Sequence, residues 1–380
     1  MAVGQRNCRL ALVVGISLLV LIGEHAVIGT ARGQGGPQCL GQPATIIGTE
    51  GNEMIVGTPG NDVIVAAGGN DVVFGEGGND AICVGSGENS GFGGVGADRI
   101  EGGPDRDLLV GGPDDDELAG GGAFDTLVGD EYSPNAPASG SGGDTLNGGD
   151  GDDIVVGDVF SLVSATGSGG DELFGGPGND EAVGDALVGT YAQDSAAVGE
   201  VAIGTGNDKI NGLTDTDLVV GDAAVHGPGS ARCGGNDRLN AETNATAGPD
   251  VSGLGPGVEL IVGDCYTTGG DATGASKDRK INGGDGIDVL VGEHYAGGTA
   301  TGNGSDTNML GAKGNDRLYG DHHPRAEERT GGGKDRVRGG KGNDFLEGGP
   351  KRDRCYGGPG RNKFVRRGPQ RCEVITGAGR

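Results

Sequence analysis

The chain has 380 residues, of which 88 are glycine and none is tryptophan, and its formal net charge at pH 7 is −27. This composition excludes an ordinary globular core built on large aromatic side chains. Either the chain is disordered, as low hydrophobicity with a high net charge usually indicates, or something other than a thick core orders it. The apolar residues recur at regular intervals, which favours the second possibility.

The amino-terminal segment has the pattern of a secretory signal peptide. Arg6 and Arg9 precede an uncharged stretch of 14 residues, 10–23, and small residues follow it. Such a stretch is too short for a comfortable membrane span. We therefore expect residues 1–33 to be a signal peptide removed near Ala31, which leaves no transmembrane span. The alternative is that the segment stays attached as an anchor.

A nine-residue repeat begins after this segment and is the most informative feature of the sequence. The unit reads Gly-Gly-x-Gly-x-Asp-x-apolar-x, and its marker residue recurs without a slip over nine units. Glycines permit the positive φ angles of a tight turn, and the apolar position predicts a short strand with one side chain turned inward. The markers are Glu53, Asp62, Asp71, Asp80, Asn89, Asp98, Asp107, Asp116 and Asp125.

The repeat resembles the calcium-binding nonapeptide of the RTX, or haemolysin-type, family. The resemblance implies an all-β fold, a parallel β-roll or β-solenoid with two nonapeptides per coil. It also implies Ca²⁺ ions held between successive coils by the marker aspartates and by turn carbonyls. Ca²⁺ binds about six to eight oxygens, so carboxylates that would otherwise repel one another become cohesive around the ion. Glu53 and Asn89 depart from the family's aspartate, which puts their sites in doubt.

After Asp125 the markers return in pairs nine residues apart, such as Asp144 with Asp153. Seven Gly-Asp or Gly-Glu pairs accompany them at spacings of 28, 27, 37, 42, 29 and 28 residues, each longer than one coil of two nonapeptides. We therefore expect the β-roll to continue with small, polar loop inserts that replace turns on one edge. The acidic residues of these pairs are Asp130, Asp158, Asp185, Asp222, Asp264, Glu293 and Asp321.

The opposite edge of the roll is predicted to be uninterrupted, apart from one insert at 241–258 before Glu259. Because turns follow one another there without inserts, we expect the best-formed column of ions on this edge. Its predicted ligands are Asp71, Asp107, Asp125, Asp153, Asp180, Asp217, Asp288, Asp316 and Asp344.

These patterns divide the chain into a signal peptide (1–33), a calcium-binding β-roll (34–366) and a basic carboxy-terminal tail (367–380). Within the roll, repeats are regular over 45–129 and 335–366 and carry inserts over 130–334. The markers correspond to about 25 nonapeptides and therefore to about 12 coils. The predicted Ca²⁺ ligands are Asp62, Asp71, Asp80, Asp98, Asp107, Asp116, Asp125, Asp144, Asp153, Asp171, Asp180, Asp208, Asp217, Asp237, Asp288, Asp316, Asp335, Asp344 and Asp353.

Seven cysteines are present, and removal of the signal peptide would take Cys8 and leave six. An even number in an exported chain favours disulfides, although six cysteines allow many connectivities. A zinc site is the weaker alternative, because there is no CxxC pair and no cysteine-histidine pair at ligand spacing. Neighbours along the sequence suggest the pairs Cys39 with Cys83, Cys233 with Cys265, and Cys355 with Cys372.

No catalytic motif of the common hydrolase, zinc-protease or phosphate-binding types is present. His322 and His323 could bind a transition metal, but we expect them to be an exposed pair in an insert. We therefore predict a secreted, calcium-binding β-roll without catalysis, whose folding is coupled to Ca²⁺ and which is an extracellular structural or binding module. The alternatives are an extracellular hydrolase with a site assembled from the inserts, and a surface adhesin.

The carboxy-terminal end differs in charge from the rest. Residues 321–380 contain 15 Lys and Arg against 8 Asp and Glu. A solvated cap is the simplest interpretation of such a charge run, and a cell-envelope or polysaccharide ligand, bound by this end or by the inserts, is the alternative. We do not expect nucleic acid as a partner.

Overall fold

The computed structural model describes residues 36–189, 201–213, 217–240, 258–306, 308–324, 326, 328–365 and 372–374. The predicted signal peptide and nearly all of the predicted insert at 241–258 lie outside these residues. Of the predicted basic tail, only residues 372–374 are described.

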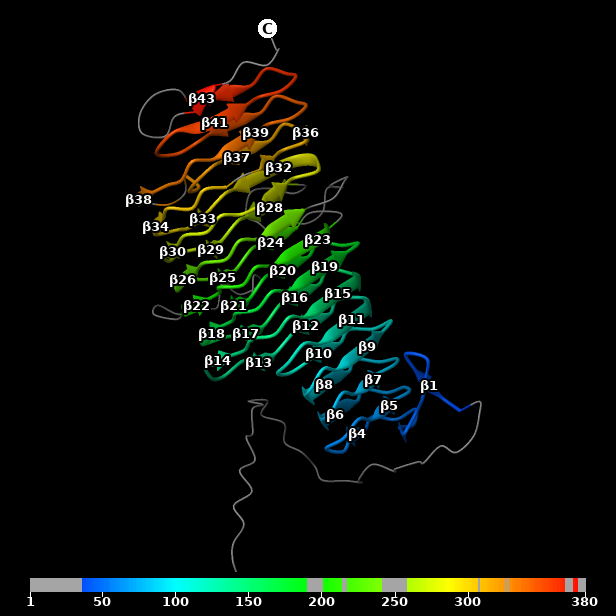
Figure 1. The fold of residues 1–380 in the computed structure, drawn as a ribbon. Helices are drawn as coiled ribbons and strands as arrows, with labels where there is room; N and C mark the ends of the chain where they lie inside the picture. Colours follow the sequence, from blue (N-terminus) through cyan, green and yellow to red (C-terminus); the bar gives the residue numbers. More distant parts are fainter. Residues whose placement is uncertain are drawn as a thin grey trace, which may run out of the picture.

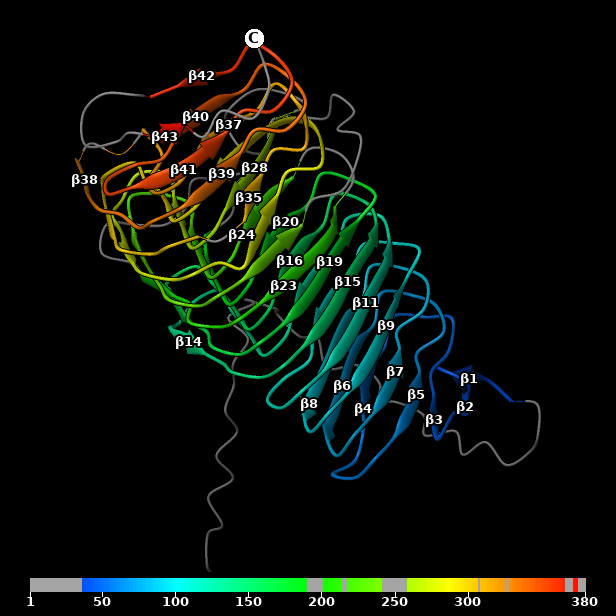
Figure 2. The same cartoon turned by 45° about the horizontal axis from the view of Figure 1, so that its top comes forward.

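Parallel strands stack along the whole described chain into an elongated β-roll (Figures 1 and 2). One of its two main sheets, called the first roll sheet, takes one strand from each coil. In order, these strands are β3 (Ile46–Ile47), β5 (Val63–Val65), β7 (Ala81–Cys83), β9 (Arg99–Gly103), β11 (Glu117–Gly122), β15 (Thr145–Asp150), β19 (Glu172–Gly176), β23 (Lys209–Leu213), β27 (Arg238–Asn240), β31 (Lys280–Asn282), β35 (Met309–Leu310), β39 (Arg336–Arg338), β41 (Asp353–Tyr356) and β43 (Cys372–Val374).

The second roll sheet takes the other repeat of each coil, so strands alternate between the two sheets along the chain. In order, they are β4 (Met54–Val56), β6 (Val72–Gly77), β8 (Ser90–Val95), β10 (Leu108–Val110), β12 (Thr126–Val128), β16 (Ile154–Val156), β20 (Glu181–Val183), β24 (Leu218–Val220), β28 (Val258–Val262), β32 (Asp285–Val291), β37 (Arg317–Tyr319), β40 (Phe345–Glu347) and β42 (Lys363–Phe364), with β36 (Lys313–Gly314) pairing β32 beside this path.

The nine-residue period fixes the register between coils. Apolar residues pair with their equivalents one coil away, as Leu109 does with Leu127 and Leu127 with Val155. The middle residue of each short strand points between the two roll sheets, where Ile64, Leu109 and Leu127 are fully buried. The predicted parallel β-roll is therefore confirmed, with a core about one apolar side chain thick per strand.

The inserts lie on one edge, as predicted, because each one follows a strand of the second roll sheet and precedes a strand of the first. The expectation that they are loops is wrong. Within the described residues they form two further parallel sheets, which widen a coil from two strands to four. The first insert sheet contains β13 (Glu131–Ser133), β17 (Val159–Ser161), β21 (Ala186–Val188), β25 (Ala223–Val225), β29 (Cys265–Thr267) and β33 (His294–Tyr295), and the second contains β14 (Ala138–Ser139), β18 (Ser164–Thr166), β22 (Val201–Ile203), β26 (Ser230–Cys233), β30 (Ala272–Gly274), β34 (Thr299–Gly302) and β38 (Glu328–Gly331).

Stacking explains why these small, polar segments become strands. A single insert buries too little apolar surface to hold a fixed shape, but neighbouring inserts supply its backbone hydrogen bonds and its packing partners. Ala186, Val188, Ala202 and Ala223 are fully buried in a core of small residues that the inserts share. Alanine-rich strands carry little strand propensity, so their composition resembles that of a loop.

Both ends of the roll are fastened by disulfides, and all three predicted pairs are confirmed. Cys39, in the antiparallel hairpin of β1 (Gln38–Cys39) and β2 (Gln42–Pro43), is bonded to Cys83. Cys355 is bonded to Cys372, which belongs to β43. Because β43 pairs with β41, part of the predicted tail is a strand of the roll. Among the described residues, the first roll sheet has 14 strands, one from each coil. Two of them, β3 and β43, lie outside the repeats counted in the sequence. The other 12 agree with the predicted number of about 12 coils.

Candidate metal centre

The marker residues form two ladders that run along the roll, one at each edge. In each step, a backbone N–H of one marker donates to the side-chain Oδ1 of the marker one coil further on, as from Asp98 to Asp116 at 2.7 Å. Of the described residues, the ladder on the insert-bearing edge, called the insert-side ladder, contains Asp62, Asp80, Asp98, Asp116, Asp144, Asp171, Asp208, Asp237, Asp278, Asp306, Asp335 and Asp353.

The ladder on the other edge, called the uninterrupted-edge ladder, is built in the same way. Among the described residues, its steps lead from Glu53 to Asp217 and from Asp288 to Asn362, and they include the departures Glu53 and Asn89. The residues of these two runs are Glu53, Asp71, Asn89, Asp107, Asp125, Asp153, Asp180 and Asp217, and then Asp288, Asp316, Asp344 and Asn362. All of the predicted Ca²⁺ ligands are therefore in one of the two ladders.

The second oxygen of most of these carboxylates makes no hydrogen bond. In both ladders Oδ2 is buried and lacks a hydrogen-bond partner at nearly every aspartate, for example at Asp98, Asp116 and Asp144. Burial of an anionic oxygen without a partner is strongly unfavourable, because nothing replaces its hydration. A row of such oxygens is therefore a row of positions for a cation.

Turn glycines leave the space that brings these oxygens together. A Cβ atom added at Gly129 would lie 1.8 Å from the carbonyl oxygen of Gly157 and 2.1 Å from Oδ2 of Asp144. The same arrangement recurs one coil later at Gly157. A carbonyl oxygen and a carboxylate oxygen thus converge on the place that any other residue would fill. Such an all-oxygen donor set suits Ca²⁺, so these residues fit the ion that the sequence predicts.

A third column of carboxylates lies beside the insert-side ladder in the widened coils. It contains the acidic residues of the Gly-Asp and Gly-Glu pairs, which stand between the second roll sheet and the first insert sheet. We call this zone, which lies between the roll strands and the insert strands of each widened coil, the neck. Within the described residues, three carboxylates come within 4.8 Å of one another in each of four neck groups: Asp130, Asp144 and Asp158; Asp158, Asp171 and Asp185; Asp185, Asp208 and Asp222; and Asp222, Asp237 and Asp264.

Burial governs the acidity of these groups. In the neck, burial and then the neighbouring carboxylate of Asp208 raise the pKa of Asp171 to about 9. Burial raises the pKa of Asp144 to about 8. Near the amino-terminal end, where the roll has two strands per coil, burial raises the pKa of Asp98 to about 7. Without a cation, burial therefore favours the protonated form of these carboxyl groups.

Part of this site was not predicted from the sequence. The acidic residues of the Gly-Asp and Gly-Glu pairs had no expected ligand role, and Asp278 and Asp306 were not among the predicted ligands. The recurrence of seven acidic residues just before the inserts was the available signal. That the uninterrupted edge carries the best-formed ion column stays a prediction, but the groups of three carboxylates lie on the opposite edge.

The histidines also differ from expectation. His322 is buried with 3 % of its surface exposed, and His294, which the sequence analysis did not single out, is completely buried. The expected exposed pair of His322 and His323 is therefore wrong for His322. The imidazole of His322 enters the neck because its coil widens there, whereas a solvated loop would have left it exposed.

Comparison with known proteins gives one family. The model described as RTX calcium-binding nonapeptide repeat matches residues 47–82, 92–127, 138–160, 165–186, 204–224 and 329–364. These segments include the regular coils at both ends and parts of the widened coils. No curated protein matches the chain.

Proposed function

We propose that this chain, which carries RTX calcium-binding nonapeptide repeats from residue 47 to residue 364, is a secreted protein that uses Ca²⁺ to fold and serves as an extracellular structural or binding module. The carrying observation is the pair of ladders in which one carboxylate oxygen joins neighbouring coils and the other is buried without a hydrogen-bond partner. Because each ion position lies between residues of different coils, binding and coil stacking are thermodynamically linked.

Two observations support an extracellular setting. The sequence begins with a segment of signal-peptide character, and the six cysteines that follow it form three disulfides. Disulfides of this kind persist in oxidising compartments, and calcium sites of extracellular modules commonly bind at about 10⁻⁴–10⁻³ M. Among the described residues, no helix has the length and apolar character needed to span a membrane.

A role without catalysis is part of the proposal. An active site added to the roll would be expected in the inserts. The inserts instead bury small apolar side chains, such as Ala186 and Ala223, in a shared core. The sequence carries none of the common hydrolase motifs. The extended surface of a roll is instead suited to spacing or to binding another macromolecule.

A calcium titration followed by far-ultraviolet circular dichroism tests the proposal. We expect a chelator to remove the β-sheet signal and added Ca²⁺ at about 10⁻⁴–10⁻³ M to restore it, whereas Mg²⁺ at the same concentration should be far less effective because it dehydrates reluctantly. A β-sheet spectrum that the chelator leaves unchanged would contradict calcium-dependent folding. Mass spectrometry of the exported protein tests secretion, with an amino terminus near residue 32 expected.

A further inference from the structure

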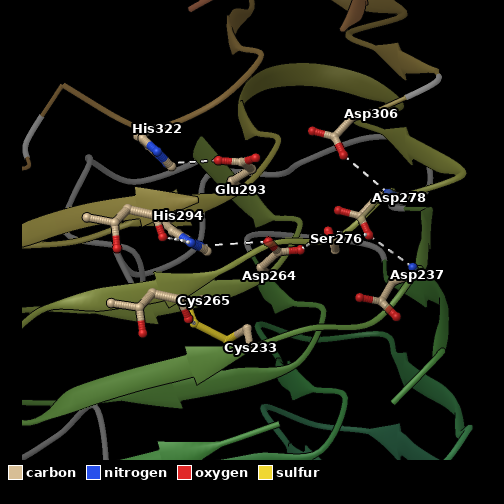
Figure 3. A network of polar contacts seen from close by, with 12 residues as sticks. Cys233, Asp237, Asp264, Cys265, Ser276, Asp278, Glu293, His294, Asp306 and His322 are labelled. Atoms are coloured by element: carbon tan, nitrogen blue, oxygen red, sulfur yellow. Dashed lines mark hydrogen bonds and ion pairs between the residues drawn. A yellow bond between two sulfur atoms is a disulfide. The ribbon is translucent and has the colours of Figure 1, made fainter. Parts of the chain in front are cut away.

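We propose that Glu293, His294 and His322 form a binding site for one transition-metal dication of the zinc type, chemically distinct from the all-oxygen calcium positions. The three residues lie in the neck near the carboxy-terminal end of the insert sheets (Figure 3). Their ligand atoms all lie within 4.8 Å of one another, and all three side chains are buried.

The two imidazole rings are held in position side by side. They stack with their centroids 5.1 Å apart and their planes 15° from parallel. Nδ1 of His322 lies 3.3 Å from Oε2 of Glu293, and Nδ1 of His294 lies 3.8 Å from Oδ2 of Asp264 (Figure 3). Both Nδ1 atoms thus face carboxylates.

Hydrogen bonds on the far side of each ring fix the tautomer. Nε2 of His294 lies 3.1 Å from the carbonyl oxygen of Thr301, and Nε2 of His322 lies 3.2 Å from that of Thr330. A carbonyl oxygen can only accept, so each Nε2 carries the proton and donates. Each neutral ring therefore presents the lone pair of Nδ1 to the cluster. Ring N–H groups that donate to backbone carbonyls are the usual second-shell partners of histidines that bind metals.

The cluster lacks the positive charge that its donors require. Neither Nδ1 atom and neither carboxylate oxygen of Glu293 has a hydrogen-bond partner. Lone pairs that face a buried carboxylate are unfavourable, and a bound dication removes this conflict.

The donor set selects the metal. Ca²⁺ prefers oxygen ligands, whereas two imidazoles with a carboxylate suit zinc and its neighbours in the first transition row. Asp264, whose Oδ2 lies 3.8 Å from Nδ1 of His294, belongs to the neighbouring all-oxygen group with Asp222 and Asp237 and is not counted as a ligand of this site. Cys265 is not available as a sulfur ligand because it is bonded to Cys233.

His294 follows a run of apolar residues in one column of the first insert sheet. His294 pairs with Cys265 in the first insert sheet, and the same position in earlier coils is held by Ala223, Ala186 and Val159. In the same coil, the acidic residue of the third column is Glu293, whereas the preceding coils have aspartate at the equivalent position. The change of donor chemistry is therefore confined to one place in the roll.

The test is a titration of the full chain with Zn²⁺ in the presence of saturating Ca²⁺, measured by isothermal titration calorimetry. We expect one equivalent of Zn²⁺ to bind without displacement by Ca²⁺. His294→Gln and His322→Gln should each lower the Zn²⁺ affinity by more than about 100-fold, since even changes in the second shell of a metal site cost about 10–100-fold. The matched control is His323→Gln, at a partly exposed residue one position further on, which should bind Zn²⁺ as the parent does.

Equal Zn²⁺ binding by the parent and the two cluster variants, or no tight equivalent at all, would overturn the proposal. If a variant fails to fold, X-ray absorption at the zinc edge of the parent decides instead: two imidazole ligands support the site, and a shell of oxygens alone refutes it. Calcium-dependent folding, measured on zinc-free parent protein, is a separate readout. If folding did not depend on Ca²⁺, the proposed function would be contradicted and the zinc result would be unaffected. If Zn²⁺ did not bind, the zinc site would be contradicted and the proposed function would be unaffected.

Discussion

The backbone N–H of Asp144 donates a 2.8 Å hydrogen bond to Oδ1 of Asp171, the equivalent residue one coil further along the roll. Oδ2 of Asp171 is buried beside this bond and has no hydrogen-bond partner. One carboxylate thus connects two coils with one oxygen and offers the other to an ion. Coil stacking and ion binding consequently depend on the same side chains.

The neck groups are expected to contribute more to calcium affinity than the uninterrupted edge. Asp158 belongs to two groups of three carboxylates, and neither of its oxygens has a hydrogen-bond partner, whereas Oδ1 of Asp153 accepts from the N–H of Asp125. Asp158→Asn should raise the Ca²⁺ midpoint of folding by about tenfold, or ~1.4 kcal/mol, and Asp153→Asn should raise it less. Circular dichroism at graded Ca²⁺ concentrations measures both midpoints. A larger shift for Asp153→Asn would restore the expectation that the sequence favoured.

Without Ca²⁺, stability should fall as the pH rises. Burial raises the pKa of Asp116 to about 9 and that of Asp180 to about 9, so the folded state holds protons that the unfolded chain releases above its ordinary carboxyl pKa. Stabilisation from these groups is complete below the unfolded carboxyl pKa of about 4 and is lost progressively as the pH rises from there to about 9. Each extra proton changes stability by about 1.4 kcal/mol per pH unit. The β-sheet circular-dichroism signal of the calcium-free protein should therefore be larger at pH 5 than at pH 8, and the opposite order would contradict the buried ladders.

Gly129 is expected to tolerate no side chain. A Cβ atom there would overlap the carbonyl oxygen of Gly157 at 1.8 Å, which is backbone and cannot rotate away. Gly129→Ala should lower the free energy of unfolding in saturating Ca²⁺ by ~3 kcal/mol, the scale of an overpacked core. Gly60→Ala is the control, because nothing lies within 4 Å of the added Cβ at that position. The control should change stability by less than about 0.5 kcal/mol, and equal losses in the two variants would show that the steric argument fails.

The Cys233–Cys265 disulfide should stabilise the widened part of the roll. It closes a sequence separation of 32 residues with a Cα–Cα distance of 5.8 Å, and it joins β26 of the second insert sheet to β29 of the first. In the chain-entropy model, its loss in Cys233→Ser with Cys265→Ser costs about 3–4 kcal/mol. Thermal unfolding in saturating Ca²⁺ should show the decrease. An unchanged midpoint would mean that the stacked insert strands alone hold the two sheets together.

Much of this molecule is determined by its period. A marker every nine residues followed by one apolar residue predicted short strands with one inward side chain, and the resemblance to the RTX family implied the parallel roll in which Leu109 stacks on Leu127. Order along the chain suggested the disulfide partners, because a solenoid brings only nearby coils into contact.

The tertiary structure alone decided what the inserts become and where the metal ligands gather. The insert strands β21 and β22 are short and rich in small residues, so they carry little strand signal of their own, and neighbouring inserts supply their hydrogen bonds and cover their apolar residues. For the same reason, the proximity of Asp130, Asp144 and Asp158, and of Glu293 to His322, could not be derived from spacing. These residues are separated by inserts of variable length, and only the closing of each insert into a pair of strands returns the chain to the neck and brings their side chains together.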